Sequence, residues 1–189
     1  MGRELALRTL SHPGPLGLLR RWRSGKLVAI ADIYIPYRLY KITVDDRRAK
    51  LTKYYAVDAA AGLLDLYEFT SPPPDGKFVE VETRNFHPVR LGESETKLLV
   101  LKKARRSLFA RGFFHMVDPV ICAEFVRPEF YMPYWAGFYG DGQNVRVTAL
   151  DAVRHTVEGS KVSEVVKLWL MDQEIESLAG QTSARQDSV

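Results

Sequence analysis

The chain has 189 residues, of which 46% are hydrophobic and 26% charged, and it is long enough to bury a core without disulfides or metals. These values exclude a collagen-like chain and a disulfide scaffold, and a single cysteine excludes an internal disulfide. The formal net charge is only +4, but residues 1–53 carry 12 Lys and Arg against four acidic residues, and residues 97–111 carry six against none.

The sequence carries no pattern typical of metal binding, membrane insertion or export. The spacing of Cys and His fits no structural zinc site, so we expect no metal and no cofactor. The longest nearly apolar run, residues 27–36, is interrupted by Asp32 and is too short to span a bilayer. We therefore predict a cytoplasmic protein without an integral membrane segment.

The first half of the chain predicts a short helix followed by an antiparallel meander. The helix is expected over residues 15–23, ending at Gly25. Alternating apolar residues then predict strands, the first of them bent at Pro36 or divided there. These strands cover residues 26–44, 51–58 and 63–69. The proline-rich residues 71–76 are typical of a linker, and residues 78–83 predict an edge strand.

The second half repeats this order. Residues 95–111 predict an amphipathic helix capped by Ser94, with basic side chains opposite its apolar face. Turn residues then separate three predicted strands, which cover residues 120–126, 130–139 and 145–152. A final helix is expected to begin at Ser160 or Ser163, and the polar residues after Leu178 are expected to be disordered.

Self-comparison indicates an internal duplication. The hexapeptide Asp-Ile-Tyr-Ile-Pro-Tyr at residues 32–37 recurs as Glu-Phe-Tyr-Met-Pro-Tyr at residues 129–134, and Ala-Val-Asp-Ala at 56–59 recurs as Ala-Leu-Asp-Ala at 149–152. The second pair is four residues closer to its hexapeptide, a difference that a hairpin turn can absorb at small entropic cost. The alternative is that two unrelated strands use similar residues.

We therefore predict an α+β fold built from two copies of a helix packed on an antiparallel β-meander. The predicted domains are a first repeat over residues 1–76 with a basic N-terminal segment, a linker or edge strand over 77–94, a second repeat over 95–178 and a disordered tail over 179–189. This layout resembles cystatin-like and PepSY-like units, in which a helix lies on an antiparallel sheet. The resemblance concerns layout alone and implies no activity.

The repeated Tyr-x-Pro-Tyr strands supply the candidate binding residues. A proline removes a backbone donor from a strand, which places it at an edge or a bulge. Tyrosine and tryptophan offer a large contact area with a polar tip. We predict an aromatic surface or groove formed by Tyr34, Tyr37, Tyr131, Tyr134 and Trp135. The alternative is that these side chains only seal the sheet against its helix.

Basic side chains gather in two clusters, one in each half of the chain. They are Arg20, Arg21 and Arg23, and Lys102, Lys103, Arg105 and Arg106. Such clusters can attract an anionic partner, although the sequence has no helix-turn-helix, KH or RRM signature. The alternative is that these residues only solvate two helices.

Catalytic candidates are few. Asp58 and Asp151 occupy matching positions after a strand, where an Asp commonly makes a turn but where a close pair acts as acid and base. Asp32 and Glu129 are expected as edge-strand charges. Cys122 lies in an apolar run that predicts a buried, inert thiol. The sequence lacks P-loop, nucleophile-elbow and metalloprotease motifs, so we assign no catalytic residue.

The leading hypothesis is therefore a non-catalytic binding or accessory protein whose aromatic surface contacts a protein or small ligand. The second hypothesis is a small enzyme with a site between the two halves, using Asp or Tyr as acid and base. The third is electrostatic binding to nucleic acid or to an anionic membrane surface.

Overall fold

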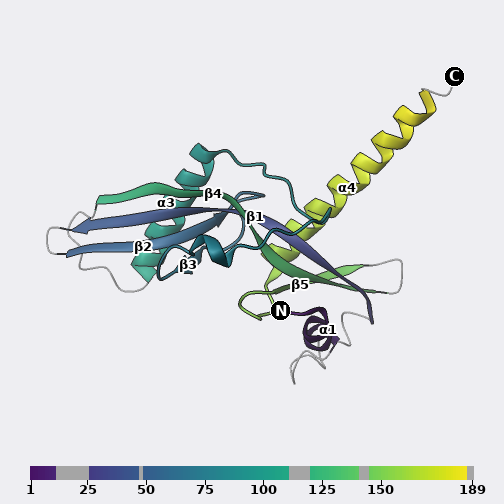
Figure 1. Ribbon diagram of the computed structural model, residues 1–189, viewed down its shortest axis with the longest axis horizontal. Coiled ribbons are helices and arrows are strands. Elements are labelled where there is room, and N and C mark those ends of the chain that lie inside the picture. Colours follow the sequence, from purple (N-terminus) through teal and green to yellow (C-terminus); the bar gives the residue numbers. More distant parts are fainter. Residues whose placement is uncertain (12–25, 47–48, 111–119, 141–144, 187–189) are drawn as a thin grey trace. The chain divides into compact units, whose positions relative to one another are not determined.

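The computed structural model describes residues 1–11, 26–46, 49–110, 120–140 and 145–186 (Figure 1). These residues form an α+β fold with one antiparallel sheet, which confirms the predicted fold class. The strands are β1 (Leu27–Asp46), β2 (Ala49–Asp58), β3 (Tyr67–Phe69), β4 (Val120–Tyr139) and β5 (Arg146–Asp151), in the sheet order β3-β2-β1-β4-β5. The helices are α1 (Arg3–Ser11), α3 (Glu93–Ala110) and α4 (Ser160–Gln186), with a short 3-10 turn, η1 (Asp75–Lys77).

Several element boundaries differ from those predicted. β1 passes through Pro36 and β4 through Pro128 without interruption, so β4 is one strand where two were predicted. α3 begins at Glu93, two residues before the predicted start. The Glu95 carboxylate accepts a hydrogen bond from Gly92 N at 2.7 Å and so caps the N-terminus of the helix. α4 continues to Gln186, so it includes residues 179–186 of the predicted tail, and residues 187–189 lie outside the described residues.

Two predictions fail or cannot be placed in the first half. Residues 78–83 form no strand, so the predicted edge strand is wrong. α1 was not predicted, whereas the helix expected over residues 15–23 lies outside the described residues.

The chain forms two compact units, which we describe separately. The central unit comprises Tyr34–Met132, and the terminal unit comprises Met1–Ile33 and Pro133–Val189. β1 and β4 each contribute residues to both units. The predicted division into two contiguous repeats stays a prediction.

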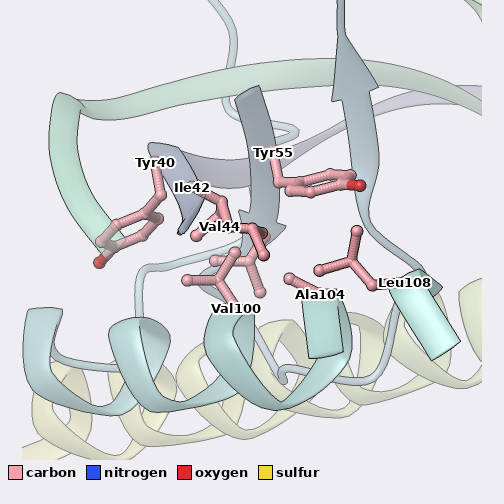
Figure 2. Close-up of a cluster of buried hydrophobic side chains, with 8 residues drawn as sticks. Tyr40, Ile42, Val44, Tyr55, Val100, Ala104 and Leu108 are labelled. Carbon is pink, nitrogen blue, oxygen red and sulfur yellow. The ribbon is translucent and has the colours of Figure 1, made fainter. Parts of the chain in front are cut away.

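The core of the central unit lies between α3 and the sheet (Figure 2). Three helix residues at four-residue spacing, Val100, Ala104 and Leu108, face side chains from alternating positions of β1 and from β2. The buried strand residues are Tyr40, Ile42, Val44, Tyr55 and Val57. Burial of each large apolar side chain contributes roughly 1.5–3 kcal/mol to folding, so α3 is held mainly by this face.

α1 packs on the terminal unit through one short face. Ala6 and Leu10 are buried with Leu150 of β5, and the Tyr139 hydroxyl donates to Leu10 O at 2.8 Å. A Cβ at Gly137 would lie 3.2 Å from the Leu10 side chain, so a glycine permits this close approach. α4 buries one face, formed by Val162, Val165, Val166 and Trp169.

The matched sequence motifs occupy the same places in their hairpins. Tyr37 lies opposite Asp58 in the β1–β2 pair, and Tyr134 lies opposite Asp151 in the β4–β5 pair. After each hairpin the chain bonds back to the proline: Ala59 N donates to Pro36 O at 2.8 Å, and Ala152 N donates to Pro133 O at 3.1 Å. Duplication of the whole unit stays a prediction.

Candidate functional site

Phe86 and Tyr131 form an exposed aromatic pair on the central unit. Their rings meet edge to face with centroids 6.2 Å apart. Phe86 is 46% exposed and Tyr131 40% exposed. Aromatic rings favour this geometry, and two rings that stay open to solvent while contacting each other present a large apolar area to a partner.

Backbone pairing with β1 holds Phe86 in place. Tyr34 N donates to Asn85 O at 2.9 Å, and His87 N donates to Tyr34 O at 2.8 Å. These bonds form a parallel bridge between Tyr34 and Phe86. The His87 side chain is buried, with Nδ1 2.9 Å from Pro88 O. Phe86 is therefore displayed from backbone that is anchored on both sides.

Glu129 gives the aromatic pair a polar neighbour. Burial raises the pKa of the Tyr131 phenol, and the negative charge of Glu129 raises it further. The hydrogen bond from Arg38 lowers the pKa of Glu129, which keeps this carboxylate ionised in the neutral pH range. Tyr131 therefore stays a neutral hydrogen-bond donor beside an acceptor.

Arg38 joins β1 to β4 and to the start of α3. Its Nε donates to Glu129 Oε1 at 2.9 Å, and its Nη2 contacts the same oxygen. Its Nη1 donates to Leu91 O at 2.7 Å and to Thr96 Oγ1 at 3.3 Å. Because Arg38 is buried, each of these bonds offsets part of the cost of removing its charge from water.

Tyr40 extends this network into the core. Its hydroxyl lies 2.7 Å from Thr96 Oγ1 and donates to Glu93 O at 3.2 Å. Burial raises the pKa of Tyr40, so the phenol stays protonated. The network therefore binds the N-terminus of α3 to the sheet, and its groups are occupied in structural bonds.

Residues 75–78 are attached to β4 by a second set of contacts. Arg127 forms an ion pair with Asp75, and its guanidinium carbon lies 4.2 Å from the centre of the Phe78 ring. Phe78 in turn meets Phe130 edge to face, with centroids 5.6 Å apart. The residues that follow leave Val79 82% exposed, which adds apolar surface to the central unit.

The predicted aromatic residues have unequal exposures. Tyr37 and Tyr134 are 1% and 3% exposed, so neither is open to a partner, and Tyr37 packs against the Phe130 ring. Tyr34 is half-buried and Tyr131 exposed. In the terminal unit, Trp135 is half-buried and donates to Met1 O at 3.3 Å. For Tyr37 and Tyr134 the burial therefore favours the alternative, in which these side chains only seal the sheet against its helix.

Asp58 and Asp151 both organise turns, one in each unit. Asp58 Oδ1 accepts hydrogen bonds from two backbone amides and Oδ2 accepts one from Leu64 N at 2.8 Å. Asp151 Oδ1 accepts bonds from the amides of Val153 and Arg154 at 2.7 and 2.8 Å. Both side chains are buried, and these contacts are those of Asx-type turns.

The basic cluster of α3 differs from the predicted one in a single residue. Lys102, Arg105 and Arg106 are exposed. Lys103 instead donates to Gly62 O at 2.7 Å and also to Leu64 O, so it fastens the loop after β2 and is not free for a partner. The predicted residues Arg20, Arg21 and Arg23 lie outside the described residues.

Two further expectations are corrected. Cys122 is exposed, because alternation along β4 turns it away from the side on which Ile121 and Ala123 pack against the core. Glu129 does not serve as an isolated edge-strand charge, since it pairs with Arg38. Sequence reasoning missed Phe86, Arg38 and Thr96. Of these three, only Arg38 could have been found from the sequence, because it lies two residues from Tyr40 and so points to the same, buried face of the strand.

No family model matches the chain, no curated protein matches it and no solved structure matches it. Among the described residues, no three His, Cys, Asp or Glu side chains are arranged to hold a metal ion. Within the same part of the chain, each helix is too short or too polar to cross a membrane.

Proposed function

We propose that this protein is a non-catalytic binding or accessory protein and that Phe86 and Tyr131 form its contact surface. The observation that carries the proposal is the edge-to-face pair itself, exposed on both rings and anchored by backbone bonds to Tyr34. Fixed aromatic side chains contribute strongly to binding because they bury a large area while losing little conformational entropy.

The chemistry of the surface indicates the kind of partner. The two rings offer an apolar contact, the Tyr131 hydroxyl offers a donor, and the Glu129 side chain, 35% exposed, offers an acceptor. A protein segment or small ligand with an apolar group and an adjacent hydrogen-bonding group fits this combination. The buried turn roles of Asp58 and Asp151 supply no acid–base pair, so binding accounts better for the surface than catalysis does.

Comparative affinity purification from native cells tests the proposal. The double variant Phe86→Ala/Tyr131→Ala is expected to lose partners that the wild-type protein retains. The matched control is Val28→Ala/Met171→Ala, which removes two exposed apolar side chains from the terminal unit. Equal recovery of every partner by the wild type and both variants, with unchanged thermal unfolding, would contradict the proposal.

The same proposal includes the internal duplication and a cytoplasmic location. The shared hairpin register, Tyr37 opposite Asp58 and Tyr134 opposite Asp151, supports duplication. The single exposed thiol, Cys122, supports a reducing compartment, where such a group persists without forming disulfides.

A further inference from the structure

The outer face of α3 concentrates positive charge that nothing in the described part of the chain neutralises. We define this face by Leu98, Lys102, Arg105 and Arg106, all of them exposed. Within the described residues the three basic side chains make no hydrogen bond or ion pair. Basic residues on the strands do find partners, as Lys41 does with Glu124 at 3.1 Å.

This arrangement works against the stability of the helix. Lys102 is three residues from Arg105 and four from Arg106, so the three charges are neighbours on the helix surface and repel one another. The last turn of α3, as far as the structure describes it, contains no basic residue, so none of these three charges gains from the helix C-terminus there. The helix therefore carries a charge cluster that folding alone does not require.

Leu98 adds an apolar side chain to this face. It lies one turn before Lys102 and is 69% exposed, whereas the residues of α3 that face the sheet are buried. At a membrane surface an exposed leucine can enter the interface while neighbouring basic side chains contact phosphate groups.

We propose that the outer face of α3 binds an anionic membrane surface. Three cations neutralise too few phosphates for firm binding to a nucleic-acid duplex, whose partners commonly contact six to ten. Lipid headgroups are mobile and can gather around a compact cluster, and a membrane, unlike a nucleic-acid duplex, offers an apolar interface to Leu98. Each basic residue near an anionic leaflet strengthens binding about fivefold, so the cluster strengthens it on the order of 100-fold.

Co-sedimentation with vesicles tests this inference on the full chain. Vesicles of equal parts phosphatidylglycerol and phosphatidylcholine are expected to bind the protein at about 0.05 M NaCl and to release most of it at about 0.5 M, because salt screens the attraction. Vesicles of phosphatidylcholine alone are expected to bind it weakly. The triple variant Lys102→Gln/Arg105→Gln/Arg106→Gln is expected to lose roughly 100-fold in affinity, and Leu98→Ala about fourfold for each methylene-sized group that enters the interface.

Two further variants test whether vesicle binding depends on the position of the charges or only on net charge, and thermal unfolding tests whether the α3 variant is still folded. Lys50→Gln/Lys77→Gln/Arg84→Gln removes the same charge from exposed positions elsewhere and is expected to bind within about fivefold of wild type. Arg105→Lys/Arg106→Lys keeps the charge and should bind like wild type. The triple variant on α3 is expected to unfold at a temperature no lower than wild type, because it relieves repulsion.

Three outcomes would overturn the inference. They are equal losses in the two triple variants, binding that survives high salt, and tighter binding to a short DNA duplex than to the anionic vesicles. The inference does not depend on the aromatic surface, so Phe86→Ala/Tyr131→Ala should bind vesicles as the wild type does.

Discussion

Arg38 and Glu129 form an ion pair whose partners differ in exposure: the Arg38 side chain is 9% exposed and that of Glu129 35%. The guanidinium therefore depends on the protein for its hydrogen bonds, whereas the carboxylate keeps part of its hydration. Arg38 also binds Leu91 O and Thr96 Oγ1 at the entrance to α3. Loss of the arginine should therefore affect the helix as well as the strand pair.

Replacement of Arg38 by methionine is expected to lower the free energy of unfolding by about 3 kcal/mol, because several partners lose a donor and cannot all reach water. Urea unfolding measures this change. Lys41→Met is the matched control, because Lys41 also lies on β1 but forms its ion pair, with Glu124 of β4, at the surface. This substitution should cost less than about 1 kcal/mol. Equal losses in the two variants would contradict a buried structural role for Arg38.

Glu129 predicts a pH dependence of stability. Its pKa is lowered in the folded state from an ordinary value near 4.5, chiefly by the hydrogen bond from Arg38. A lowered pKa stabilises the fold above the ordinary value, and this contribution is lost as the pH falls through the folded-state pKa. In urea unfolding at several pH values, the free energy of unfolding of the wild type should exceed that of Glu129→Gln at neutral pH. This difference should shrink below about pH 4.5. A difference independent of pH would show that the carboxylate charge adds nothing.

The Phe86–Tyr131 contact should appear as a coupling energy. In a double-mutant cycle with Phe86→Leu and Tyr131→Leu, the edge-to-face pair is expected to contribute about 1 kcal/mol beyond the two single effects. The control cycle combines Phe86→Leu with Leu98→Ala on α3, for which the coupling should be close to zero. A negligible coupling for Phe86 and Tyr131 would mean that the rings do not pack in solution.

The helix and strand faces of the central unit were predictable because they repeat. Val100, Ala104 and Leu108 return every four residues, and Tyr40 and Ile42 alternate along β1, so local spacing alone identifies their buried sides. The same reasoning fails where a proline suggests a break, as in β4, since tertiary pairing carries the strand through Pro128.

The candidate site was harder to predict because its contacts join distant segments. The strand position of Arg38 indicates burial, but no local pattern shows that its partner is Glu129, 91 residues later. Phe86 lies in an irregular segment without periodicity, and only its backbone bridge to Tyr34 places it beside Tyr131. Lys103 belongs to a run of basic residues, but a loop carbonyl removes it from the charged face. Such pairings depend on chain topology and leave no local pattern.

The two turn-forming aspartates provide the last prediction, because their matching positions conceal unequal bonding. Both oxygens of Asp58 accept backbone hydrogen bonds, including that from Leu64 N at 2.8 Å. In Asp151 only Oδ1 does so, and the buried Oδ2 has no hydrogen-bond partner among the described residues. In an asparagine at position 58, the NH2 group must face a backbone N–H, so that two donors oppose each other. At position 151 the NH2 group can replace Oδ2, toward which no backbone amide of the described residues donates, and the amide oxygen can keep both bonds.

Asp58→Asn is therefore expected to lower the free energy of unfolding by about 2 kcal/mol, since charge-assisted bonds are lost and two donors are opposed. Asp151→Asn is expected to cost less than about 1 kcal/mol, because both of its accepted bonds can persist and a buried charge is removed. Urea unfolding measures the two changes. Hydrogen exchange at the Leu64 and Val153 amides supplies a local reading in each unit, with faster exchange expected only at Leu64. Equal costs and equal exchange rates would mean that the two carboxylates perform the same role despite their different contacts.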